Sequence, residues 1–273
     1  MLDDSPYFRM IELDEIDSTN NFLKGYHPLN PVDVTLVTTE YQTAGRGQQG
    51  NTWEAERGQN LLFSLLLSAL LVPASESFVI SEAIALAIRE ALIDELRLMN
   101  EEYHQPPLFI NHQSPIITVK WPNDIYIGDC KIAGILIEND LCGQHISRSI
   151  IGCGVNINQQ HFLFPTLSTQ EGIPTPVSLY QLLGKVTERR FVLETIMEHF
   201  MHHYEAIQRG DFEAIHAAYR AALYHCTGAH LFRDSIGVFE ASIEGVEPTG
   251  HLLLRDSEGH ERRYAFKEVA FLS

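Results

Sequence analysis

The chain has 273 residues, of which 45% are hydrophobic and 20% are charged. These proportions are ordinary for a globular protein with a buried core, and the length fits one large domain or one domain with a small addition. The 36 acidic and 19 basic residues give a formal net charge of -17, which argues against a large basic face for nucleic acid.

Cysteine usage and the apolar segments indicate a cytoplasmic protein without a membrane anchor. The four cysteines form no C-x-x-C pair and no metal-ligand spacing, so we interpret them as reduced, mostly buried thiols. The N-terminal residues are acidic and lack the signature of a signal peptide. The most apolar run, residues 61–71, is shorter than the roughly 20 residues that cross a bilayer, and we interpret it as a buried strand.

The first half of the chain mixes strand and helix patterns. Residues 17–20 predict a helix start, with Asp17 or Ser18 as the N-cap. Strands are predicted at 34–39 and 61–67, and a helix at 79–96, where apolar residues recur at helical spacing. Residues 100–115 contain three prolines and predict an irregular surface insertion. Strand patterns separated by turn signals then predict a mainly antiparallel sheet, with segments 116–121, 125–127, 132–137 and 149–157.

Helix patterns return in the second half. Ser178 is expected to cap a helix that ends at Gly184, a longer helix is predicted for residues 191–208, and a third is expected to follow Asp211 as its N-cap. After Gly228 the pattern changes to short strands with turns at 247–250 and 256–259. We therefore predict a main domain of residues 1–226 and a small β-barrel or sandwich of residues 227–273.

Residues 45–50 form a glycine-rich loop, Gly-Arg-Gly-Gln-Gln-Gly, which precedes Trp53. Glycines tolerate positive φ, so successive N–H groups in such a loop can converge on an anion. Arg46 adds a planar cation that suits a carboxylate or a phosphate. A plain surface turn is the alternative, because glycine-rich loops are common.

Residues 119–136 carry two lysines between strongly apolar flanks. Pro122 is expected to end one strand, and Asn123 and Asp124 suit the turn that follows. Lys120 and Lys131 would be solvated in an ordinary hairpin, but cations in apolar surroundings favour an anionic ligand nearby. Together with the glycine loop, this segment predicts a site for an anion made of a carboxylate and a phosphate.

Three further patterns have ordinary structural explanations. Residues 15–20 include Ser-Thr-Asn, which any helix start uses, and the glycines of residues 150–157 are compatible with a plain buried strand. His199, His202 and His203 have the spacing of metal ligands on a helix, but such histidines are far more often partly exposed helix residues. We predict no metal site at these histidines.

The motifs together resemble the biotin–protein ligase family, which activates biotin with ATP and transfers it to a lysine of a carrier protein. The similarity covers residues 12–156 at motif level and is most specific at residues 119–136. It implies an α+β fold: a mixed, mainly antiparallel sheet with helices in a class II synthetase-like catalytic domain, and a small C-terminal SH3-like β-barrel. Some relatives carry an N-terminal DNA-binding domain, for which we expect no room before residue 12.

The resemblance implies that biotin and Mg2+-ATP give biotinyl-5′-adenylate, and that a lysine of a biotin carboxyl carrier protein then takes the biotin. Lys131 and Arg46 are expected to stabilise the charge on the reacting phosphoryl group, with Lys120 assisting. Asp124 is expected to orient Mg2+ or a lysine. The implied biotin site comprises Ser18, Thr19, Asn20, Gln42, Arg46, Gly47, Gln48, Lys131, Gly134, Gly152 and Gly154. The implied ATP and adenylate site comprises Gly45, Arg46, Gly50, Trp53, Lys120, Asn123, Asp124 and Asn156.

The chain departs from the family pattern at two places. Gln48 stands where many relatives have a second arginine that covers the adenylate, so we expect a weaker hold on the intermediate. The segment before Val119 is also longer than usual. For the adenine ring, the sequence offers Phe162 or Phe164 as a stacking partner.

Two alternatives remain open on the sequence. A lipoate or octanoate ligase or transferase resembles this family in fold, although Ser18, Thr19 and Gln42 suit a ureido ring better than a hydrophobic chain. A non-catalytic biotin- or nucleotide-binding regulator is the second, against which the retention of Lys131 and Arg46 argues. Relatives often pair through sheet edges, so a homodimer is also left open.

Overall fold

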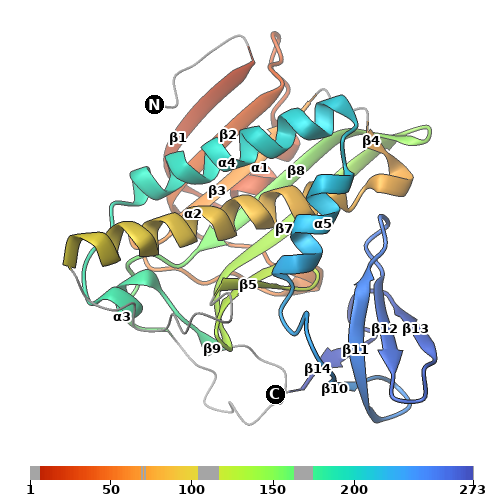
Figure 1. Ribbon diagram of the computed structural model, residues 1–273. Helices are drawn as coiled ribbons and strands as arrows, with labels where there is room; N and C mark the ends of the chain where they lie inside the picture. Colours follow the sequence, from red (N-terminus) through yellow and green to blue (C-terminus); the bar gives the residue numbers. More distant parts are fainter. Residues whose placement is uncertain (1–6, 69, 71, 104–116, 163–174, 273) are drawn as a thin grey trace.

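The computed structural model describes residues 7–68, 70, 72–103, 117–162 and 175–272, and its strands form two sheets (Figure 1). The larger sheet has nine strands in the order β1-β2-β3-β8-β7-β6-β5, with β4 beside β8 and β9 beside β7. Only the pairs β1/β2 and β7/β9 of the described strands are parallel, so the sheet is mixed and mainly antiparallel, as predicted. Its strands are β1 (Phe8–Ile16), β2 (Val34–Gln42), β3 (Leu61–Leu67), β4 (Val72–Pro73), β5 (Ile117–Lys120), β6 (Asp124–Ile127), β7 (Cys130–Cys142), β8 (His145–Val155) and β9 (Thr175–Pro176).

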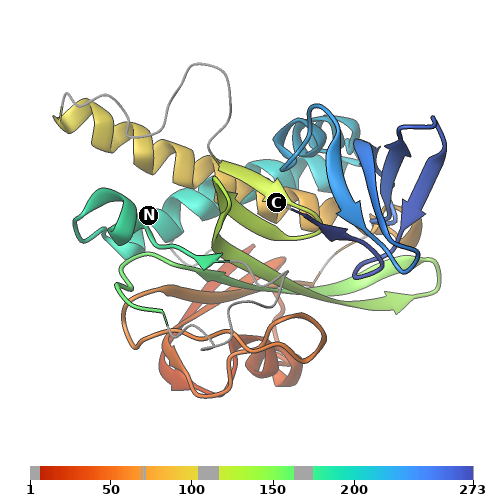
Figure 2. The same cartoon turned by 90° about the horizontal axis from the view of Figure 1, so that it is seen from below.

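Helices pack on both faces of this sheet (Figure 2). On one face lie α2 (Val79–Tyr103) and α4 (Arg189–Arg209), side by side, with α5 (Glu213–Ala222) against α2. On the other face lies α1 (Thr19–Gly25). β3 is buried along its whole length because its side chains alternate between these layers: Leu65 and Leu67 join the core under the long helices, while Leu66 packs with Leu23 of α1. The short elements are α3 (Leu179–Leu183), η1 (Gln48–Gly50) and η2 (Ala74–Glu76).

The second sheet is small, antiparallel and C-terminal, as predicted. Its turns contain Gly250 and Gly259, whose φ angles of +94° and +86° favour glycine. It meets the main sheet where the indole N–H of Trp121 donates to the Gly250 carbonyl at 3.0 Å. Its strands, in the order β13-β12-β11-β10-β14, are β10 (His230–Arg233), β11 (Val238–Val246), β12 (Leu252–Asp256), β13 (Glu261–Tyr264) and β14 (Ala270–Phe271). The domain boundary at residue 226 stays a prediction.

Most predicted elements are present, and the end signals predicted for α3 are confirmed. Ser178 and Gln181 form a reciprocal capping box at the start of α3, and Gly184 ends that helix in the left-handed conformation. The predicted N-cap Asp211 is wrong, because Phe212 holds that position before α5. The prediction of irregular structure from residue 100 is also wrong for residues 100–103, because α2 continues to Tyr103, three residues before the first proline. Residues 104–115 lie outside the described residues.

Two predictions about composition can also be compared with the structure. All four cysteines are free thiols, as predicted, but the expectation that most of them are buried is wrong, because only Cys153 is buried. None of the helices that the structure describes is long and apolar enough to cross a membrane.

Two of the three clustered histidines bind acids of α2: His199 Nε2 lies 2.8 Å from Asp94 and His203 Nε2 lies 3.0 Å from Glu90. These contacts join α4 to α2, in keeping with a structural role for both side chains.

Candidate functional site

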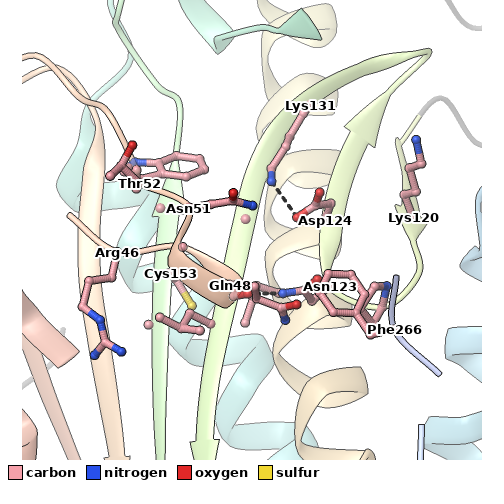
Figure 3. Close-up of a pocket in the computed structure, with 18 of the residues that line it drawn as sticks. Arg46, Gln48, Asn51, Thr52, Lys120, Asn123, Asp124, Lys131, Cys153 and Phe266 are labelled. Atoms are coloured by element: carbon pink, nitrogen blue, oxygen red, sulfur yellow. Dashed lines mark hydrogen bonds and ion pairs between the residues drawn. The ribbon is translucent and has the colours of Figure 1, made fainter. Parts of the chain in front are cut away.

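A cavity of about 940 Å³ lies between the start of α1, the loop of residues 42–54, the ends of β5 to β8 and the C-terminal segment 266–271 (Figure 3). Most of the residues expected at the site line it: Ser18, Thr19, Asn20, Gln42, Arg46, Gly47, Gln48, Trp53, Lys120, Asn123, Asp124, Lys131, Gly134, Gly152 and Gly154. Three expected residues are not among its lining: Gly45, Gly50 and Asn156. The sequence motifs, which are up to 136 residues apart, therefore converge on one cavity.

Lys131 and Asp124 form an ion pair in the wall of the cavity (Figure 3). Lys131 Nζ lies 2.7 Å from Asp124 Oδ1, and both side chains are about three-quarters buried, with 22% and 26% exposed. The pair forms because β6 and β7 are adjacent antiparallel strands joined by a two-residue turn. Of the two roles expected for Asp124, orienting a lysine is the one that this geometry displays.

Asn123 has a structural contact next to that pair. It is buried, and its side-chain Nδ2 donates to the carbonyl of Ile135 on β7. The bond ties the turn after β5 to the neighbouring strand. This bond uses one of the two hydrogens of the Asn123 amide nitrogen.

Lys120 sits in an aromatic cage and forms no ion pair with the residues that the structure describes. Its Nζ lies 4.8 Å from the ring centre of Tyr126, 5.6 Å from that of Tyr224 and 5.5 Å from that of Phe271. Burial lowers the pKa of Lys120, and the nearby Asp124 partly offsets this. The sequence analysis did not find Tyr224 or Phe271, because both belong to the C-terminal part of the chain.

Arg46 points away from the Lys131–Asp124 pair (Figure 3). Its guanidinium contacts both carboxylate oxygens of Glu138 on β7, at 3.0 and 3.3 Å, and it also donates to Asn21 at 3.0 Å. Glu138 was missed at the sequence level, although β-strand alternation places it on the same face of β7 as Gly134 and Leu136. The expected contact of Arg46 with a reacting phosphoryl group therefore requires this side chain to turn.

The glycine loop is closed by its own backbone. The N–H of Gly47 donates to the Asn51 carbonyl at 2.7 Å, and the N–H of Trp53 donates to the Gly45 carbonyl at 3.0 Å. These two amides are therefore engaged within the loop instead of facing an anion. Gly50 is exposed and has a φ of +85°.

Protein side chains occupy the space over the strand glycines Gly134, Gly152 and Gly154. A Cβ atom on Gly154 would overlap the indole of Trp53, and one on Gly134 would lie 3.0 Å from it. A Cβ atom on Gly152 would overlap the amide of Asn20. The glycines make room for Trp53 and Asn20, and the buried indole N–H of Trp53 has no partner among the described residues.

The polar end of the cavity is a chain of hydrogen bonds that joins the half-buried Gln42 to the buried residues Thr19, Ser64 and Asn20. Thr19 donates its backbone N–H to Gln42 Oε1 at 2.8 Å. The hydroxyl of Ser64 on β3 lies 2.6 Å from both Thr19 Oγ1 and Asn20 Oδ1. Ser64 was not predicted as a site residue. It is the single polar residue in the apolar strand β3, which the sequence analysis interpreted as a buried strand. Ser18 is the N-cap of α1 but makes no side-chain capping bond.

Comparison with known proteins decides the family. The model of the biotin/lipoate A/B protein ligase family matches residues 13–156. The chain belongs to this family. Bifunctional ligase/repressor BirA of Bacillus subtilis is 26% identical over 256 residues, covering 94% of this chain and 72% of that protein. Biotin–[acetyl-CoA-carboxylase] ligase of Paracoccus denitrificans is 26% identical over 229 residues, covering 82% of this chain and 85% of that one.

Solved structures show the same fold over nearly the whole chain. Biotin protein ligase from Aquifex aeolicus, in complex with biotin and ATP, superposes with a TM-score of 0.67 at 23% identity, covering 96% of this chain and 97% of that one. The ligase of Leishmania major in complex with biotinyl-5-AMP gives 0.60 at 22% identity, covering 96% and 100%. The α+β fold with a small C-terminal β structure is therefore confirmed.

Part of the cavity wall lies outside the residues that the family model matches. The C-terminal segment contributes Phe266, Lys267, Val269, Ala270 and Phe271. This segment brings a further cation, Lys267, to the cavity. Phe162, one of the two expected adenine partners, is not among the lining residues, and Phe164 lies outside the described residues. The side chain of Asn156 contacts the segment that precedes α3. Its Nδ2 donates to the Val177 carbonyl at 3.1 Å.

Proposed function

We propose that the chain is a biotin–protein ligase, which forms biotinyl-5′-adenylate from biotin and ATP and transfers biotin to a lysine of a biotin carboxyl carrier protein. The observation that carries the proposal is that one cavity holds both the Lys131–Asp124 pair and the neutral polar end around Thr19 and Gln42. A cyclic urea needs donors and acceptors in a dry pocket, and a carboxylate and phosphates need cations.

In the first step, a carboxylate oxygen of biotin attacks the α-phosphorus of ATP, and the bond to pyrophosphate breaks. Negative charge gathers on the phosphoryl oxygens, and Lys131 is the cation held in place beside them by Asp124. Arg46 would add a second cation after leaving Glu138. In the second step, the acceptor amine attacks the biotinyl carbonyl carbon, the bond to AMP breaks, and the amine proton passes to solvent.

Magnesium enters this proposal with ATP. Among the described residues, no group of three or more His, Cys, Asp or Glu side chains is placed to hold a metal ion. Mg2+ is commonly bound by one or two carboxylates together with the phosphates of a nucleotide, and Asp124 supplies one carboxylate in the cavity wall. Asp124 would thus hold Mg2+ only in combination with the bound nucleotide, where it would help to neutralise the phosphates.

The finer points of the proposal concern the acceptor and the compartment. We propose the carrier domain of acetyl-CoA carboxylase as acceptor, in line with the name of the Paracoccus relative. The free thiols favour a cytoplasmic location. The polar cavity end favours biotin over lipoate, whose apolar ring and chain would offer no strong hydrogen bond to the polar groups around Thr19 and Gln42.

The test is incubation of the protein with biotin, ATP and a biotin carboxyl carrier domain, followed by intact-mass measurement of the carrier. We expect one biotinyl addition that requires both ATP and the acceptor lysine. Controls omit ATP, replace biotin by lipoate, or use a carrier whose acceptor lysine is arginine. An unmodified carrier, or a carrier that takes lipoate instead of biotin, would overturn the proposal.

A further inference from the structure

We propose that His225 is a positioning residue for Lys120, because its ring fixes the plane of the Tyr224 phenol, one wall of the aromatic cage around that lysine. The inference rests on the proposed function, with Lys120 in the assisting role that the family resemblance implies. It adds to the site a residue that lies outside the part of the chain that the family model matches.

Three aromatic rings are stacked between the second sheet and the cage. The ring centres of Tyr224 and His225 are 3.9 Å apart at an angle of 22°, and those of His225 and His230 are 3.8 Å apart at 8°. Two rings cannot stack on the same face of a third at such distances, so His225 lies between the other two. His230 belongs to β10, and its Nε2 donates to the Thr227 carbonyl at 2.8 Å. The stack therefore runs from β10 to Tyr224.

Tyr224 is held at three points, and each restrains a different motion. Its backbone N–H donates to the Val119 carbonyl at 2.9 Å, which places its backbone beside β5. Its phenol hydroxyl donates to Asp129 Oδ1 at 2.6 Å. The phenol oxygen lies on the long axis of the ring, so this hydrogen bond leaves rotation about that axis free. Stacking on His225 restrains the rotation and thereby sets the plane of the ring.

The plane of the Tyr224 ring matters to Lys120, because a cation is attracted to the face of an aromatic ring and not to its edge. Lys120 Nζ lies over this ring, 5.6 Å from its centre. The other two rings of the cage, Tyr126 and Phe271, meet Tyr224 at tilts of 43° and 42°, so they do not fix its plane by stacking. Apart from a 3.4 Å hydrogen bond to the Tyr126 hydroxyl, the faces of the cage rings direct the ammonium group.

The backbone of His225 adopts a conformation that few residues with a side chain adopt. Its φ is +62°, in the left-handed region that is unfavourable for a residue with a Cβ atom. Strain of this kind persists only where the surrounding structure imposes it, and it is concentrated at functional sites. Here it accompanies the insertion of the ring between Tyr224 and His230.

His225 acts through contact and not through charge. Burial, together with the nearby His230 and Lys120, lowers the pKa of His225 to about 4, although Asp129 opposes this. Its buried Nδ1 has no hydrogen-bond partner among the residues that the structure describes. At neutral pH the ring is therefore uncharged, and an aromatic ring without nitrogen atoms should serve the same purpose.

The experiment compares His225→Gly, which removes the ring, with His225→Phe, which keeps one. Glycine adopts a positive φ without strain, and this relief offsets part of the lost stacking, so we expect both variants to fold. His260→Gly is the matched control, because His260 lies in the turn between β12 and β13 with 70% of its side chain exposed. Biotin-dependent exchange of pyrophosphate into ATP gives kcat and KM, and calorimetry gives the dissociation constant of biotin.

We expect His225→Gly to lower the kcat of exchange on the order of 10-fold, with biotin affinity within about two-fold of wild type, because a misplaced cation slows the chemistry and leaves the polar end of the cavity intact. His225→Phe and His260→Gly should exchange at close to the wild-type rate. In a Lys120→Met background, His225→Gly should change the rate by less than about two-fold, because two residues that act through one contact are not additive.

Two results would overturn the inference. Equal losses in His225→Gly and His225→Phe would mean that stacking on Tyr224 is not what matters. An undiminished effect of His225→Gly in the Lys120→Met background would mean that His225 does not act through Lys120. Thermal unfolding checks each variant, and His230→Ala, which removes the outer ring of the stack, replaces His225→Gly if that variant does not fold. A wild type without biotin-dependent exchange is a different outcome, since it would remove the proposed function itself.

Discussion

Glu82 is expected to make the stability of the fold depend on pH, and Glu82→Gln tests this. The side chain lies on α2 with 2% of its surface exposed, and His216 Nδ1 on α5 is 2.5 Å from its Oε2. Burial raises the pKa of Glu82 from 4.5 to about 7, an effect that His216 partly opposes and the nearby Glu76 increases.

A raised pKa means that the folded state holds this proton at pH values where the unfolded chain has released it. The contribution is therefore fully present below about pH 4.5 and is lost as the pH rises towards 7. At about 1.4 kcal/mol per pKa unit, a rise from 4.5 to about 7 corresponds to about 3 kcal/mol. Glutamine cannot ionise, so it keeps a neutral group at this position at every pH.

The measurement is urea unfolding of the wild type and Glu82→Gln at pH 5 and pH 8. We expect the free energy of unfolding of the wild type to fall relative to that of the variant by about 2 to 3 kcal/mol between these pH values. Glu198→Gln, the same change on an exposed residue of α4, is the matched control and should run parallel to the wild type. Parallel pH dependence of the wild type and Glu82→Gln would refute the reasoning.

Three further predictions follow from the site and the charge. Gly154→Ala should lower the free energy of unfolding by about 1 to 3 kcal/mol, because its methyl group would overlap the Trp53 indole. Gly25→Ala is the control, because a Cβ atom at Gly25 would meet no atom within 4 Å. Equal effects of the two changes on thermal unfolding would contradict the packing argument. Gln48→Arg should slow the dissociation of biotinyl-adenylate several-fold, because a charge-assisted hydrogen bond is more favourable than a neutral one by about 1 kcal/mol. Equal dissociation rates of the wild type and the variant, measured by trapping released adenylate, would show that this cavity residue does not hold the intermediate. With a net charge of -17, the chain should not bind duplex DNA at physiological salt, with or without biotin. A sharp, biotin-dependent change in the gel mobility of the DNA would count against this.

Residue spacing alone predicted those contacts of the site that local structure sets, whereas the meeting of its distant segments was expected only from the family resemblance. Lys131 and Asp124 lie seven residues apart across one hairpin, so strand pairing alone brings them together. The same holds for Ser178 and Gln181 at the start of α3, where the capping box acts within one helical turn. Such contacts depend on how far apart two residues lie along the chain, and this separation can be read directly from the sequence.

The missed parts depend on contacts between distant segments. Glu138 meets Asn20 across 118 positions, and Phe271 reaches Lys120 from the second sheet. β1 was also missed, because it is an edge strand whose exposed positions carry acids instead of a continuous apolar run. The strand glycines were found, but which side chain would fill the space above them depends on packing that no spacing rule encodes.

Biotin-dependent exchange of pyrophosphate into ATP tests the central claim most directly, because it reports formation of the adenylate without any acceptor. The wild type should catalyse exchange only when biotin is present. Lys131→Met should reduce the rate on the order of 100- to 1,000-fold, with thermal unfolding close to that of the wild type, since it removes the cation that we propose stabilises the reacting phosphoryl group. Exchange by Lys131→Met near the wild-type rate, or wild-type exchange that does not need biotin, would contradict the account.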